Sequence, residues 1–122
     1  MDPVDIDAAL ATFTETWSPR RLASVNDYDV KLVKVDGDFT WHSHEETDEL
    51  FLVLDGELTI ALDGPEASDE VVLGPRQLYV VPRGVQHRPR ARPGTSVLLL
   101  EPGEVVNTGD AGGPLTSETQ PL

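Results

Sequence analysis

Two spacings of apolar residues divide the chain into a short helical start and a longer β-rich remainder. Ile6, Leu10, Phe13 and Trp17 recur every three or four residues after Asp5, which predicts an amphipathic helix over about 5–17. From residue 20 onward the period changes to two, which is typical of strands. The predicted strands are 28–35, 49–54, 57–62, 70–73, 77–81, 85–91 and 95–101. Short strands at this spacing predict an all-β sandwich or barrel with one N-terminal helix.

The turn signals between these strands suggest how neighbouring strands pair. Asp55-Gly56 separates two apolar runs, which predicts a two-residue hairpin that sets Val53 opposite Leu58. A further turn is predicted at 63–65. Cross-strand partners share a face of the sheet, so one set of side chains is expected to point into the barrel: Glu49, Phe51, Val53, Leu58, Ile60 and Leu62. Leu50, Leu52 and Leu54 then face outward and need a cover, either the N-terminal helix or a second subunit.

Composition agrees with a turn-rich β protein. The 122 residues include 10 Gly and 10 Pro, and the length suits one domain spanning 1–122. We expect the barrel at about 20–102 and a polar tail at 103–122 that is extended over the surface or partly disordered. The absence of cysteine excludes disulfides, thiolate metal sites and cysteine nucleophiles. No apolar run approaches the length that spans a bilayer, so we expect a cytoplasmic protein without a membrane partner.

The charge is strongly acidic and unevenly distributed. A formal charge of −13 makes nucleic acid a poor partner. The segment 71–100 contrasts with the rest, because it carries five arginines and no acid. Alternation along 85–91 places Arg88 and Arg90 outward when His87 faces inward. This segment is interpreted as a solvated strand edge whose positive charge complements acidic groups elsewhere, on the same chain or on a second subunit. Together with the outward leucines, this uneven charge predicts a homodimer.

Histidine is used sparingly, and its positions indicate a metal site. Two of the three histidines, His42 and His44, are two residues apart and so share one face of an extended chain. Neutral imidazole is a common ligand for divalent ions, and Glu49 begins the next apolar run. The third, His87, follows a Pro82–Gly84 turn. A barrel without metal is the alternative. The other acids of this region, Glu45, Glu46 and Asp48, are expected in a solvated turn.

The same residues resemble two motifs of the cupin superfamily. His42-Ser43-His44, with Glu49 and Gly56 at the appropriate distances, is similar to the first motif, and the PRGVQH stretch at 82–87 is similar to the second. The resemblance implies a double-stranded β-helix, the jelly-roll barrel of small bacterial single-domain cupins. It also implies one divalent metal ion, Zn, Fe, Mn, Ni or Co, held by His42, His44, Glu49 and His87. Arg76 and Gln77 depart from the family pattern, in which a glycine and an acid are usual.

The resemblance implies an enzyme whose metal acts on a small-molecule substrate, with the reaction type open among dioxygenase, isomerase, decarboxylase, lyase and cyclase chemistry. One alternative is a non-catalytic domain that binds or senses a small ligand. The other is a sugar-phosphate isomerase, which needs an anion clamp that outward arginines do not supply. The candidates for catalysis are Tyr28, Tyr79 and Gln77. The expected substrate pocket consists of Thr40, Phe51, Val53, Leu58 and Ile60.

Overall fold

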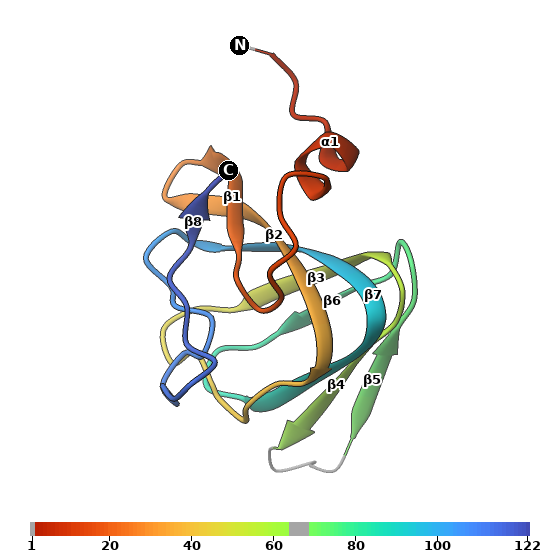
Figure 1. Cartoon of the computed structure of the whole chain (residues 1–122). Helices are drawn as coiled ribbons and strands as arrows, with labels where there is room; N and C mark the ends of the chain where they lie inside the picture. Colours follow the sequence, from red (N-terminus) through yellow and green to blue (C-terminus); the bar gives the residue numbers. More distant parts are fainter. Residues whose placement is uncertain (1, 64–68) are drawn as a thin grey trace.

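Two long strands, β2 (Tyr28–Asp38) and β7 (Gln86–Pro102), run through the whole barrel in the computed structural model (Figure 1). The structure describes residues 2–63 and 69–122, so Gly64 and Pro65 of the turn predicted at 63–65 lie outside it. The remaining elements are α1 (Ile6–Leu10), β1 (Arg20–Val25), β3 (Glu49–Asp55), β4 (Leu58–Asp63), β5 (Glu70–Leu73), β6 (Leu78–Val81) and β8 (Gln120–Pro121). The helix in the described residues is too short to cross a membrane.

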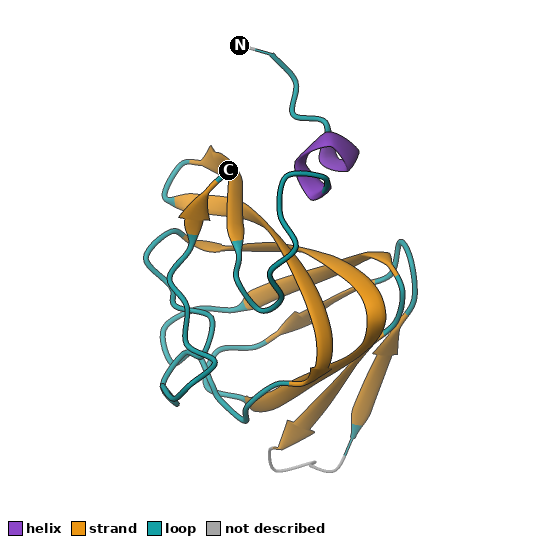
Figure 2. Ribbon diagram, in the orientation of Figure 1, coloured by secondary structure: helices purple, strands orange, loops and turns teal. Residues whose placement is uncertain are grey.

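Strand β7 connects the two halves of the barrel because each half of β7 has a different partner. Its first half pairs with β4, which also pairs with β5, and its second half pairs with β3, which also pairs with β6. Strand β2 runs antiparallel along nearly all of β7, and β1 and β8 extend the sheet beyond β2. This arrangement confirms the predicted all-β double-stranded β-helix with a short N-terminal helix (Figure 2).

The predicted hairpin between β3 and β4 is wrong. The two strands do not pair with each other, and the chain crosses from one layer to the other at Gly56, which has φ of 84°. Thr95 occupies this corner and accepts a hydrogen bond from the Glu57 N–H at 3.1 Å. An Asp-Gly pair signals that the chain turns, but the strand after the turn pairs with whichever neighbour the barrel provides. Here both β3 and β4 pair with β7 instead.

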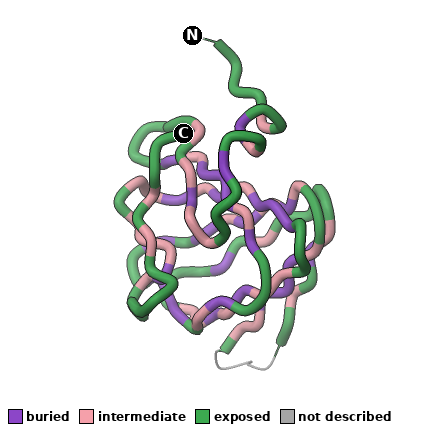
Figure 3. Tube along the Cα trace, viewed as in Figure 1, coloured by how far each residue is buried: buried purple, intermediate pink, exposed green. Residues whose placement is uncertain are grey.

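The inward face was nevertheless predicted correctly, because it depends on alternation and not on the pairing partner. Phe51, Val53, Leu58 and Ile60 are all buried in one core cluster with apolar side chains of β2 and β7. Buried segments run along the barrel strands in Figure 3, whereas most of the N-terminal segment is exposed. Leu62 is only partly buried against this core.

The N-terminal helix is shorter than predicted. It ends at Leu10 instead of continuing to Trp17, although Asp5 caps it as expected by accepting a hydrogen bond from the Ala8 N–H. The Lys34 ammonium donates to the carbonyls of Leu10 and Phe13, so these groups do not continue the helix. Trp17 lies beyond the helix with φ of 57°. Phe13 still packs with the helix on Leu32, and Leu54 lies at the edge of this second cluster.

The C-terminal tail is folded against the barrel. Thr108 is fully buried, and Asn107 donates to the Trp17 carbonyl at 2.9 Å. At the end of the chain, β8 pairs in parallel with β1. The segment 103–117 therefore lies on the barrel wall beside the 40–47 loop. Hydrogen bonds between residues that are far apart in sequence hold it there.

The outer face of β3, β6 and β7 is apolar and only half covered. Leu50 lies between Val80 and Leu100, and Leu52 lies between Leu78 and Leu98. Leu78 and Val80 are 56% and 41% exposed. We call these six side chains the outer apolar face.

We expect a second copy of the chain to cover the outer apolar face, because monomeric proteins rarely expose apolar patches of this kind. Light scattering at micromolar concentration should give the mass of a dimer for the wild type. Leu78→Lys should give the mass of one chain, because it places a charge within the interface. A wild-type protein that remains monomeric when concentrated would contradict the prediction.

Candidate metal centre

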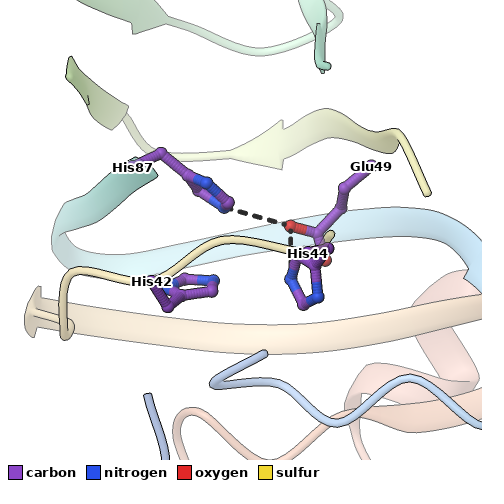
Figure 4. A group of neighbouring side chains, drawn as sticks. All are labelled: His42, His44, Glu49 and His87. Carbon is purple, nitrogen blue, oxygen red and sulfur yellow. Dashed lines mark ion pairs between the residues drawn. The ribbon is translucent and has the colours of Figure 1, made fainter. Parts of the chain in front are cut away.

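Two strands and one loop bring four potential ligands together inside the barrel (Figure 4). His42 and His44 come from the loop between β2 and β3, Glu49 begins β3, and His87 lies near the start of β7. All four side chains are buried, and one potential ligand atom of each lies within 4.8 Å of the others. The structure therefore brings together all four residues that the sequence predicted as a metal site.

Backbone hydrogen bonds fix where two of the imidazoles point. His42 and His87 form an isolated antiparallel bridge, with N–H to carbonyl distances of 3.0 and 2.8 Å in the two directions. The His42 Nδ1 atom is 2.9 Å from the Thr40 carbonyl, and the His87 Nδ1 atom is 3.0 Å from the Val85 carbonyl. A carbonyl only accepts, so each Nδ1 carries the proton and each Nε2 is left with a free lone pair. This is the tautomer in which Nε2 binds a metal.

The donor atoms fit a metal ion better than they fit each other. His44 Nε2 and His87 Nε2 are buried and have no hydrogen-bond partner within the described part of the chain, which is costly unless something else binds them. Each lies 3.4 Å from Glu49 Oε1, too far for a well-formed hydrogen bond. Two ligand atoms each about 2.1 Å from one tetrahedral ion would be roughly 3.4 Å apart. Three imidazoles and one carboxylate therefore form a donor set that suits a borderline divalent ion.

The electrostatics keep the ligands in the forms that bind metals. Burial, together with the neighbouring His87, lowers the pKa of His42 to about 4, so this imidazole is neutral at pH 7. Burial alone would raise the pKa of Glu49, but the neighbouring Glu101 carboxyl group and the His44 and His87 imidazoles outweigh burial and hold that pKa well below its usual range. Glu49 is therefore ionised. A neutral imidazole and an ionised carboxylate need lose no proton on binding a cation.

An apolar pocket leads to the site. His42 and Glu49 line one end of it, and the walls are aliphatic side chains of β2 and β7 together with aromatic rings. Trp17 stacks on Phe39 with ring centroids 4.4 Å apart, and Phe39 meets the His42 ring edge-on at 5.4 Å. The cavity is small, about 40 Å³. The described residues that line it include no Lys and no Arg.

Of the side chains predicted to form the pocket, only Phe51 and Leu58 line it. Val53 and Ile60 are fully buried in the core behind it. Thr40 does not line the pocket either, and it contacts the site through its backbone carbonyl, which accepts a hydrogen bond from His42 Nδ1. The four apolar residues were predicted from inward direction alone, which does not distinguish the pocket wall from the packed core. Thr40 was predicted as a polar contact whose orientation the sequence does not determine.

The three candidate catalytic residues lie outside this pocket. Tyr28 is 41% exposed on the surface. The Tyr79 ring packs on the core cluster from β6, in register with Phe51. Gln77 is exposed, and its side chain accepts from the Gly74 N–H within the turn before β6. The preceding residue, Arg76, has φ of 69°, so this turn keeps a left-handed backbone without the usual glycine. These placements do not support a catalytic role for any of the three.

Two kinds of residue line the pocket without having been predicted: strand residues that follow the alternating pattern, and one residue of the tail. Val33, Val35, Val97 and Leu99 line the pocket and follow the two-residue period, so alternation indicated them. Asn107 also lines it, but no local pattern predicts that the tail reaches this wall.

The tail also contacts the ligand loop directly. Asp110 accepts a hydrogen bond from the Ser43 N–H at 2.8 Å, and this contact lowers the pKa of Asp110. Gly109 lies against the same loop, and a Cβ there would be 3.1 Å from His44 Nδ1. Ser43 separates the two loop histidines, so the tail supports the segment that carries them.

Residues 29–103 match the cupin domain family model. The uncharacterized protein YdbB of Bacillus subtilis is 38% identical over 80 residues, which are 66% of this chain and 68% of that protein. A cupin-2 domain protein from Shewanella frigidimarina is 39% identical, and its crystal structure superimposes with a TM-score of 0.76 over 81% of this chain and 93% of that one.

A second structure is similar in fold alone. Hydroquinone 1,2-dioxygenase from Sphingomonas sp. TTNP3, solved with 4-hydroxybenzoate bound, is 18% identical with a TM-score of 0.75. The match covers 84% of this chain but 32% of the dioxygenase chain. The family model and the two relatives that share more than a third of the aligned residues, taken with the two motifs gathered in the barrel, show that the chain belongs to the cupin domain family.

Proposed function

We propose that the chain binds one divalent metal ion through His42, His44, Glu49 and His87 and is an enzyme acting on a small, mostly apolar molecule. The observation that carries the proposal is the pair of buried Nε2 atoms without partners, on His44 and His87, beside an ionised Glu49 at the end of an apolar pocket. When bound, the metal supplies a Lewis acid or, if it is redox-active, a centre for oxygen activation.

The chain's own residues contribute orientation and exclusion of water. The carbonyls of Thr40 and Val85 hold two imidazoles in the ligand tautomer. The aliphatic walls and the Trp17–Phe39 stack favour an apolar or aromatic substrate over a charged one. Ligand pockets usually measure about 300–1,000 Å³, so a ring-sized substrate requires Trp17 or the adjoining tail to move outward.

The sugar-phosphate isomerase alternative has less support. The arginines of β7 contact groups outside the pocket: the Arg88 guanidinium lies over the Trp41 ring at 5.5 Å, and Arg90 pairs with Glu70 at 2.9 Å. Arg92 pairs with Glu57 at 3.3 Å. A phosphate group entering the pocket would therefore meet no guanidinium among the residues that line it.

Trp17 provides a direct test of ligand entry. The chain has two tryptophans, so in Trp41→Phe all tryptophan fluorescence comes from Trp17 at the pocket wall. The compounds to titrate are hydroquinone, catechol, 4-hydroxybenzoate and small carbonyl compounds. We expect those that enter the pocket to change Trp17 emission in a saturable way. A Trp17→Phe variant is the matched control, because its remaining Trp41 lies outside the pocket. Saturable changes of equal size in both variants would contradict binding in this pocket.

Turnover is tested on protein reconstituted separately with Fe(II), Mn(II), Co(II), Ni(II) and Zn(II). We expect at least one metal form to convert a compound that perturbs Trp17, and Glu49→Gln to abolish the conversion. Saturable binding without turnover in every metal form would favour the alternative of a non-catalytic ligand-binding domain.

A further inference from the structure

A buried Lys–Glu pair lies directly behind the candidate metal ligand Glu49. Lys31 of β2 and Glu101 of β7 are 0% and 1% exposed, and their Nζ and Oε1 atoms are 3.1 Å apart. Lys31 also donates to the Val105 carbonyl at 3.1 Å. Burying a lysine beside a glutamate costs free energy, and replacing such a pair by apolar residues is often neutral or stabilising. Stability alone therefore gives little reason for a Lys–Glu pair inside an apolar barrel.

The strand register places this pair against the metal centre. Phe51 pairs with Leu99 and Leu50 with Leu100, so the next antiparallel step sets Glu49 opposite Glu101. Both side chains are buried on the inward face, where opposite residues have Cβ atoms about 4.5–5.5 Å apart. The two carboxyl groups are placed to share a hydrogen bond in which Glu101 carries the proton and donates to the ionised Glu49. Oε2 of Glu101 has no other partner in the described chain, since Lys31 takes Oε1.

We propose that Glu101, fixed by Lys31, is a positioning residue that holds the Glu49 carboxylate in the orientation required to bind the metal. The inference rests on the proposed metal site. Glu49 Oε1 lies 3.4 Å from the Nε2 atoms of the two histidines. Because the Glu49 carboxyl group is planar and rigid, a contact with Glu101 also fixes the direction in which Oε1 points. Groups that hydrogen-bond a metal ligand orient it, and their loss typically lowers metal affinity about 10- to 100-fold.

The Val105 carbonyl extends this support into the tail. Val105 lies in the tail shortly after β7, which ends at Pro102, and the same tail reaches Ser43 between the ligand histidines through Asp110. Lys31 thus links the Glu49 side of the centre to the segment that braces the His42–His44 loop.

Variants of Glu101 separate positioning from packing. Glu101→Gln keeps both contacts, because its amide oxygen accepts from Lys31 and its NH₂ group donates to Glu49. Glu101→Leu removes both contacts. Glu101→Asp keeps the carboxyl group but withdraws it by one methylene, so it serves if the leucine variant does not fold. The exposed pair Arg90–Glu70, formed between β7 and β5, offers a control, with Glu70→Leu.

The measurement is Zn(II) and Co(II) affinity by chelator competition, with the visible spectrum of the Co(II) form as a second readout. We expect Glu101→Gln and Glu70→Leu to stay within about threefold of wild type, and Glu101→Leu and Glu101→Asp to bind about 10- to 100-fold more weakly with a changed Co(II) spectrum. Wild-type affinity and an unchanged spectrum in Glu101→Asp and Glu101→Leu would overturn the inference. A wild type that binds no metal would instead refute the proposed metal site.

Discussion

Replacing Glu49 by Gln should lower the affinity for Zn(II) or Co(II) by more than about 100-fold, because loss of a ligand exceeds the 10- to 100-fold effect of losing a group that orients one. Glu49 supplies the anionic charge of the donor set and lies 3.4 Å from both His44 and His87. The change is nearly isosteric, so the barrel should keep its fold. The measurement is metal content after dialysis against a weak chelator, followed by competition titration.

Glu46→Gln is the matched control for this variant. It is the same substitution three positions away, at an exposed residue outside the group of four. We expect its metal affinity to equal that of the wild type. Equal affinity in Glu49→Gln and the wild type would exclude Glu49 as a ligand. Equal losses of metal affinity in both variants would show that the effect comes from removing any negative charge in this region.

The apoprotein should lose stability as the pH falls from 7.5 to 5. Burial lowers the pKa of His42 from 6.5 to about 4, so in this range the unfolded chain takes up a proton that the folded chain does not. Uptake by the unfolded state lowers the free energy of unfolding by up to about 1.4 kcal/mol per pH unit below 6.5. His42 should therefore contribute a loss of about 2 kcal/mol between pH 7.5 and pH 5.

Urea unfolding of chelator-treated protein at the two pH values measures this loss. The comparison with His42→Asn isolates His42, because the variant retains a polar side chain that does not titrate in this range. We expect the wild type to lose about 2 kcal/mol more than the variant. An equal loss in both proteins would show that His42 is not buried in its neutral form.

The group of four candidate ligands was predictable because its signals are local. Spacing by two residues sets His42 and His44 toward one centre, and a family motif places Glu49 and His87 with them. Inward direction was also predictable, since alternation fixed the burial of Phe51 and Leu58 even though β3 and β4 pair with β7 and not with each other. A turn sequence reports a change of chain direction but not the partner of the next strand.

The pocket wall and the support behind Glu49 depend on contacts between distant residues. Asn107 donates a hydrogen bond to Trp17, which is 90 positions away in the sequence, and Lys31 donates one to Glu101, which is 70 positions away. For Glu101 a signal was present, since alternation from Val97 and Leu99 points a carboxylate into the barrel, where a charge needs a partner. No comparable signal exists for Trp17, whose positive φ breaks the helical spacing that the sequence suggested.

The most direct test of the metal centre is a crystal structure of the protein loaded with Co(II), with anomalous diffraction recorded on both sides of the cobalt absorption edge. We predict one anomalous peak per chain inside the barrel, about 2.0–2.2 Å from three imidazole Nε2 atoms and one carboxylate oxygen. The ligands should be His42, His44, His87 and Glu49. A loaded crystal with no peak among these four side chains, or with its peak at another site, would contradict the account.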